Sequence, residues 1–129
     1  MTLRIIGHVS SLPRTPVSEV VTRQIIRSSS SVGANIAEGH GRFSLAAFRN
    51  HLQIARGSAA ETDNWLAVLA DAKLMESAVE PELHHDCSVL MGALTNRIRA
   101  LDSQLKAAKS KVGDEMVDYV PQSLEGSDA

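Results

Sequence analysis

The residues best suited to chemistry stand together where His84, His85, Asp86 and Cys87 follow one another. These residue types are common metal ligands, but zinc sites usually space them as C-x-x-C or H-E-x-x-H, and neither spacing occurs in this chain. Cys87 is in phase with the apolar residues that follow it, so it is predicted to be a small buried hydrophobic residue. The two histidines are expected in the first turn of a helix, in solvent. We therefore expect no metal ion and no cofactor.

Two carboxylates, Glu38 and Glu61, could face each other across two helices. A di-metal site would combine them with Glu-x-x-His motifs on two further helices, a set that the chain does not contain. The serine-nucleophile signature G-x-S-x-G is also missing. No catalytic residue is therefore predicted, and the carboxylates are expected to accept hydrogen bonds where helices meet, with Gln24 or Arg27 as donors.

A run of serines and glycines at 28–41 could be a phosphate-binding loop, a flexible linker or the inside of a helix. A phosphate loop needs a strand and a spacing such as G-x-x-x-x-G-K-[ST], which this run lacks. A spacing of three and four residues persists through the run, at Val21, Ile25, Ser28, Val32, Asn35 and Gly39. This spacing predicts a helix over 16–38 whose small residues, such as Ser29 and Gly33, let neighbouring helices come close. We expect it to end at Gly39-His40-Gly41, with one glycine in the left-handed conformation.

Two longer apolar repeats follow. The first begins at Leu45 and predicts a helix over 44–75, with Ser44 as its N-cap. The second begins near Cys87 and predicts a helix over 81–109. The sequence therefore predicts an all-α bundle dominated by three long helices, and the few residues before Pro13 leave room only for a short first helix.

Charge is unevenly distributed, although the net charge is only −2. Residues 1–60 carry seven arginines and two acidic residues, whereas residues 61–129 carry six basic and thirteen acidic residues. The last eighteen residues hold five acidic residues and no basic one. We predict a bundle domain over 1–111 and a flexible acidic tail over 112–129.

The arginines are candidates for binding nucleic acid. Arg42, Arg49 and Arg56 recur every seven residues and are predicted to form one stripe along the 44–75 helix. Arg23 and Arg27, one turn apart on the preceding helix, could extend this stripe. A belt of this kind attracts phosphate backbones without reading sequence. The alternative is a solvated stripe that neighbouring acidic residues neutralise.

The segments Gln24-Ile-Ile-Arg27, Asn35-Ile-Ala-Glu38-Gly39 and Gly57-Ser58-Ala-Ala-Glu61, followed by Trp65, carry a family resemblance. They resemble the bacterial four-helix-bundle family that includes the ribosomal RNA intervening-sequence proteins. The chain is also similar to the accessory variability proteins of diversity-generating retroelements. The resemblance implies an up-down antiparallel four-helix bundle, a ring-like homopentamer and no catalytic site. Its retroelement branch also implies binding to RNA or DNA and to a reverse transcriptase.

Two functional classes remain open at this point: a nucleic-acid-binding accessory protein and an assembly or protein-interaction scaffold. With a single cysteine and no evident signal peptide or membrane span, the chain is expected to be cytoplasmic. The residues to which we assign structural or interface roles are Ser29, Gly33, Asn35, Glu38, Gly39, Gly57, Glu61 and Trp65.

Overall fold

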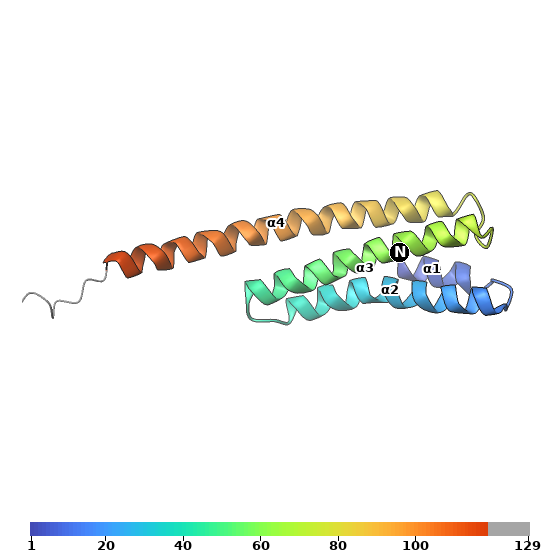
Figure 1. Cartoon of the computed structure of the whole chain (residues 1–129), viewed down its shortest axis with the longest axis horizontal. Coiled ribbons are helices and arrows are strands. Elements are labelled where there is room, and N and C mark those ends of the chain that lie inside the picture. Colours follow the sequence, from blue (N-terminus) through green and yellow to red (C-terminus); the bar gives the residue numbers. More distant parts are fainter. Residues whose placement is uncertain (119–129) are drawn as a thin grey trace, which may run out of the picture.

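The computed structural model describes residues 1–118 and shows an up-down antiparallel bundle (Figure 1). A short helix, α1 (Thr2–Val9), is followed by three long ones, α2 (Pro16–His40), α3 (Leu45–Asp71) and α4 (Glu80–Asp118). No strand occurs among residues 1–118. The predicted all-α four-helix bundle with a short first helix is confirmed. No helix in this part of the chain combines the length and the apolar character needed to cross a bilayer.

Side-chain hydrogen bonds determine where α2 and α3 begin. The Thr15 hydroxyl accepts a bond from the Ser18 N–H at 3.1 Å, and the Thr15 N–H donates to the Ser18 hydroxyl at 2.9 Å. This reciprocal capping box precedes Pro16, which suits a first helical position because its missing N–H is not needed there. Ser44 accepts a bond from the Ala47 N–H at 3.0 Å, so the predicted N-cap of α3 is confirmed.

The end of α2 differs from the prediction, because no glycine there is left-handed. Gly41, the C-cap residue, has φ −76° and ψ −6°, and no glycine among residues 1–118 has a positive φ. Gly39 is required for a different reason, the close approach of α3. A Cβ at Gly39 would lie 2.9 Å from both Phe48 Cδ2 and His51 Cβ. The prediction failed because glycine serves helix ends and helix contacts alike.

α3 ends at Asp71, earlier than the predicted residue 75. Lys73 has a φ of 57°, and its N–H bonds to the Ala70 carbonyl at 2.9 Å. The Leu74 N–H bonds to the Leu69 carbonyl, also at 2.9 Å. Together these bonds form a Schellman motif, whose left-handed position is usually glycine. Because lysine is not typical of this position, nothing in the sequence indicated that α3 ends here.

The hydrophobic core changes along the bundle because α1 covers only one end. Beside α1, buried side chains come from all four helices, as Ile5, Ile25, Leu66 and Leu83 illustrate. The second buried cluster, which includes Leu52, comes from α2, α3 and α4 alone. The bundle is therefore four-helical at one end and three-helical at the other (Figure 1).

α4 extends well beyond the ends of α2 and α3 (Figure 1). It reaches Asp118 instead of ending near residue 109, so residues 112–118 of the predicted tail are helical. The acidic composition suggested a tail, but the alanines and lysines at 107–111 favour helix, and Glu115 and Met116 in the segment itself are also good helix formers. The rest of the predicted tail, 119–129, lies outside the described residues.

Candidate nucleic-acid interface

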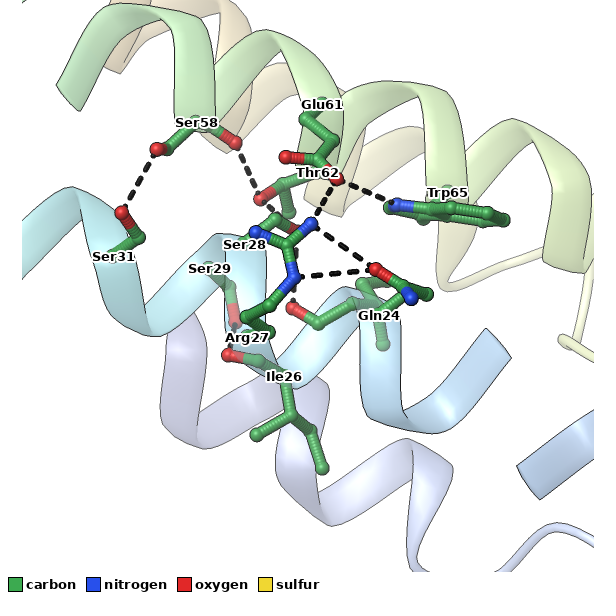
Figure 2. Close-up of polar contacts among 11 residues, drawn as sticks. Gln24, Ile26, Arg27, Ser28, Ser29, Ser31, Ser58, Glu61, Thr62 and Trp65 are labelled. Atoms are coloured by element: carbon green, nitrogen blue, oxygen red, sulfur yellow. Dashed lines mark hydrogen bonds and ion pairs between the residues drawn. The ribbon is translucent and has the colours of Figure 1, made fainter. Parts of the chain in front are cut away.

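The small residues of α2 contact α3 through a chain of hydroxyl groups (Figure 2). The Thr62 hydroxyl lies 2.8 Å from the Ser58 carbonyl and 2.9 Å from the Ser28 hydroxyl. The Ser58 hydroxyl in turn lies 3.0 Å from the Ser31 hydroxyl. Ser28 and Thr62 are fully buried, and within residues 1–118 every buried side-chain nitrogen and oxygen has a partner. This run is a helix–helix contact and not a phosphate loop.

The other small residues of this region have different surroundings. Ser29 lies on the α1 side of α2, where its carbonyl accepts a bond from the Thr2 hydroxyl at 3.0 Å. Gly33 and Gly57 are exposed, and a Cβ at either position would meet nothing within 4 Å. Contacts within the described chain therefore do not require these two glycines. An interface role for them stays a prediction about a second molecule.

Arg27, Glu61 and Trp65 form the polar edge of the α2–α3 contact (Figure 2). The Arg27 guanidinium is ion-paired with Glu61 and donates to Gln24 Oε1 at 3.1 and 3.2 Å. The Trp65 Nε1–H donates to the same Glu61 carboxylate at 3.4 Å. Glu61 thus meets Arg27, one of the two donors that the sequence suggested. Trp65 also packs against the core cluster beside α1.

A second polar chain links α2 and α3 near the end of α2. Asn35 donates to the Ser31 carbonyl at 2.9 Å, and its Oδ1 lies 3.2 Å from His51 Nδ1. Glu38 is ion-paired with Arg42 at 2.6 Å and lies 3.9 Å from His51 Nε2. The hydrogen bond from Arg42, with the charge of His51, lowers the pKa of the Glu38 carboxyl. The His51 side chain is only 18% exposed.

The candidate arginines do not lie on one stripe. Arg42 precedes α3 and turns back to Glu38 of α2. Arg49 is ion-paired with Asp102 of α4, and Arg56 donates to the Thr95 hydroxyl of the same helix at 3.4 Å. The seven-residue spacing aligns Arg49 with Arg56, but the helix starts too late to carry Arg42.

Arg23 and Arg27 lie in other regions and do not extend that row. Arg27 belongs to the α2–α3 contact described above. Arg23, together with Arg14, lines a cavity of about 520 Å³ at the turn between α1 and α2. Arg23 and Arg27 therefore both lie at the end of the bundle that α1 covers.

The fold assembles a larger group of positive charges that the sequence analysis missed. The contacts of Arg49 with Asp102 and of Arg56 with Thr95, together with the groove that Arg49 and Lys109 line, show that residues 95–109 of α4 lie beside the first half of α3. We call the part of the bundle formed by residues 35–58 and 92–111 the basic end. It carries two acidic residues, Glu38 and Asp102. Its eight basic residues are Arg42, Arg49, Arg56, Arg97, Arg99, Lys106, Lys109 and Lys111.

The opposite end, formed by residues 1–34 and 59–91, has the reverse balance. It carries five basic and eight acidic residues. Dividing the sequence at residue 60 concealed this separation, because the antiparallel pairing of α3 and α4 brings lysines and arginines of the second half beside arginines of the first. Aligning the two apolar repeats in antiparallel register is the step that could have revealed it.

A groove between α3 and α4 crosses the basic end. It has a volume of about 390 Å³ and is lined by Ala46, Arg49, Asn50, Asp102, Leu105, Lys106 and Lys109. Nearby, the guanidinium of Arg97 lies 5.7 Å from the centre of the Phe48 ring, a cation–π distance. Three cations and one carboxylate border the groove, a balance that favours an anionic ligand such as phosphate.

The residues of the histidine–cysteine cluster have separate surroundings in this fold. Cys87 is fully buried, and burial, assisted by the charges of Asp63 and Asp86, raises the pKa of its thiol to about 11. The reactive thiolate is therefore scarce at neutral pH. His84, expected in solvent, lies between Asp63 and Glu80 and connects α3 to α4. Within residues 1–118 no three His, Cys, Asp or Glu side chains converge as a metal site requires.

Comparison with known proteins assigns the chain to a family. A crystal structure of a protein of unknown function from the S23 ribosomal protein family of Bacteroides thetaiotaomicron is similar to it, with a TM-score of 0.70. The two sequences are 31% identical, over 75% of this chain and 90% of that one. No curated protein matches the chain. The model of the 23S rRNA-intervening sequence protein family matches residues 1–96, about three quarters of the chain, and the chain therefore belongs to that family.

Proposed function

We propose that the protein binds the phosphate backbone of nucleic acid through the basic end of its bundle. The observation that carries this proposal is the ratio of eight basic residues to two acidic residues within residues 35–58 and 92–111, beyond which α4 continues with three acidic residues, Asp114, Glu115 and Asp118. Even with both carboxylates neutralised by cations, six positive charges remain. Binding by such a surface is driven by the release of counterions from the phosphates and is largely independent of sequence.

The groove between α3 and α4 supports the proposal geometrically. Arg49 comes from α3, whereas Lys106 and Lys109 lie one turn apart on α4, so cations border the groove on both sides. The guanidinium of an arginine presents a planar set of donors that matches a phosphate. The proposed function needs no catalytic residue, and a cytoplasmic location is part of the same proposal.

The test compares two triple variants with the same change of charge. Lys106→Gln, Lys109→Gln and Lys111→Gln remove three cations from α4 at the basic end. Arg14→Gln, Arg23→Gln and Lys73→Gln remove three from the opposite end. Fluorescence anisotropy with structured RNA and with duplex DNA should show at least about tenfold weaker binding for the first variant only. Equal weakening by both variants, or no binding by the wild type at low salt, would contradict the proposal.

We also propose that the protein forms a homo-oligomer, the homopentamer that the family resemblance implies. The supporting observation is apolar surface on α1 and on the first turns of α2, where Leu3, Val17 and Val20 are 84%, 61% and 56% exposed. Sedimentation showing a stable monomer at micromolar concentration would contradict it. A reverse transcriptase as partner stays a prediction from the resemblance, to be tested by co-purification.

A further inference from the structure

Phe43 is fully exposed, in the loop that joins α2 to α3. The two other aromatic residues among 1–118 behave differently, since Phe48 is buried and Trp65 packs against the core. The contacts of Phe43 therefore contribute little to this fold. A large aromatic ring held in solvent is available for a ligand.

Phe43 lies between an ion-paired arginine, Arg42, and the start of α3. It follows Arg42 directly, and it precedes Ser44, the N-cap of α3. The α3–α4 groove begins one turn further along the helix, at Ala46, and continues to Arg49. Over this short stretch the chain therefore presents an exposed ring, a helix N-terminus and arginines that can contact phosphate.

We propose that Phe43 stacks on an unpaired nucleobase whose neighbouring phosphates lie in the α3–α4 groove. The inference rests on the proposed function and specifies its ligand as single-stranded nucleic acid or an unpaired segment of a folded RNA. A base inside a duplex is already stacked on its neighbours, so its face is not accessible to the ring. Aromatic side chains beside a basic groove are the usual means of holding single strands, because every base offers a π-face.

A protein partner fits this site less well. Leu45, which is 45% exposed, is the other large exposed apolar side chain among residues 39–50, and two arginines, Arg42 and Arg49, flank the pair in sequence with no acidic residue between them. Protein interfaces are most apolar and least charged at their centre. A ring that follows an arginine in the chain and precedes a groove with three cations by three residues matches instead the alternation of base and phosphate along a nucleic-acid strand.

The experiment measures affinity for a short oligothymidylate and for a DNA duplex of equal length, using wild type and Phe43 variants. Phe43→Ala should weaken binding of the single strand about 5- to 150-fold, the change that corresponds to 1–3 kcal/mol per stacked base. Its affinity for the duplex should stay within about twofold of wild type. Phe43→Trp should retain single-strand binding, whereas Phe43→Leu, apolar but without a π-face, should lose it. Val89→Ala, at an apolar residue of the opposite end that is 58% exposed, is the control and should change neither affinity.

Three results would overturn the inference. Phe43→Ala could leave single-strand affinity unchanged, it could weaken both ligands equally, or Phe43→Leu could bind as well as wild type. In each case the wild type still binds nucleic acid, so the proposed function stands. Failure of the wild type to bind either ligand would instead remove the proposed function. Because Phe43 is fully exposed in a loop, its substitution leaves the core intact.

Discussion

Arg49 of α3 and Asp102 of α4 form an ion pair that joins the two halves of the basic end. Both side chains line the α3–α4 groove, where Asp102 is the only carboxylate beside three cations. The pair therefore has two effects. Asp102 orients the Arg49 guanidinium toward the groove, and it also occupies donors that a phosphate would otherwise use.

Replacing Asp102 by asparagine should strengthen nucleic-acid binding by about threefold or more at low salt, because the net charge of the basic end rises by one. The free energy of unfolding should fall by less than about 1 kcal/mol, since the pair is partly exposed. Asp71→Asn makes the same charge change at the opposite end and is the matched control. Anisotropy titrations check this, and weaker binding by Asp102→Asn would show that orienting Arg49 matters more than competing for it.

Gly39→Ala and Gly33→Ala should have opposite effects on stability. Gly33 lies inside α2 with open space around its Cα, so alanine there should stabilise the protein by about 0.5–1 kcal/mol. At Gly39 the added methyl group would lie 2.9 Å from Phe48 and His51, and such overpacking costs about 1–3 kcal/mol. Urea denaturation should therefore place Gly39→Ala at least about 1 kcal/mol below Gly33→Ala. Equal free energies of unfolding for the two variants would contradict this, because they would mean that α2 and α3 can move apart at Gly39 without loss of stability.

The buried hydroxyl pair of Ser28 and Thr62 should be energetically coupled. Ser28→Ala and Thr62→Val should each lower the free energy of unfolding by about 1–3 kcal/mol, because each leaves a buried polar group with fewer partners. The double variant should be more stable than the sum of the two losses predicts, by at least about 0.5 kcal/mol. Additive losses in a double-mutant cycle would contradict the contact.

Cys87 should make folding stability depend on pH in the alkaline range. Its thiol has a pKa of about 11 in the folded protein, raised chiefly by burial from an ordinary value of 9.0. Below pH 9 the thiol is protonated in both states. Between pH 9 and 11 only the unfolded chain releases the proton, so stability falls as pH rises through this window. The midpoint of urea unfolding should therefore decline more steeply with pH for wild type than for Cys87→Ala. Parallel declines of the two proteins would contradict a raised pKa of Cys87.

Much of the fold could be predicted from apolar spacing, because heptad repeats fix both the helices and the faces they bury. Ser44 as a cap and Cys87 as a core residue follow from the same local reasoning. Helix ends were less predictable, since the Schellman motif at Lys73 lacks its usual glycine. The composition of residues 112–118 also suggested a tail where α4 continues.

The candidate site could be predicted only in part, because it depends on how helices pair. Sequence spacing selects residues on one helix, and it identified Arg49 and Arg56. It could not place Lys106 beside Arg49, since that neighbourhood arises only when α4 folds back along α3. It also linked Arg27 with Arg49, although Arg27 is engaged by Glu61 in a different contact.

The central claim is that the basic end binds phosphate backbones, and the salt dependence of binding tests it most directly. With six cations in excess, affinity for single-stranded nucleic acid should fall steeply, with log K against log salt approaching a slope of about −4 if all six neutralise phosphates. The variant lacking the three α4 lysines should show a flatter slope by about two units. A slope near zero in the wild type, or no complex at low salt, would contradict the account.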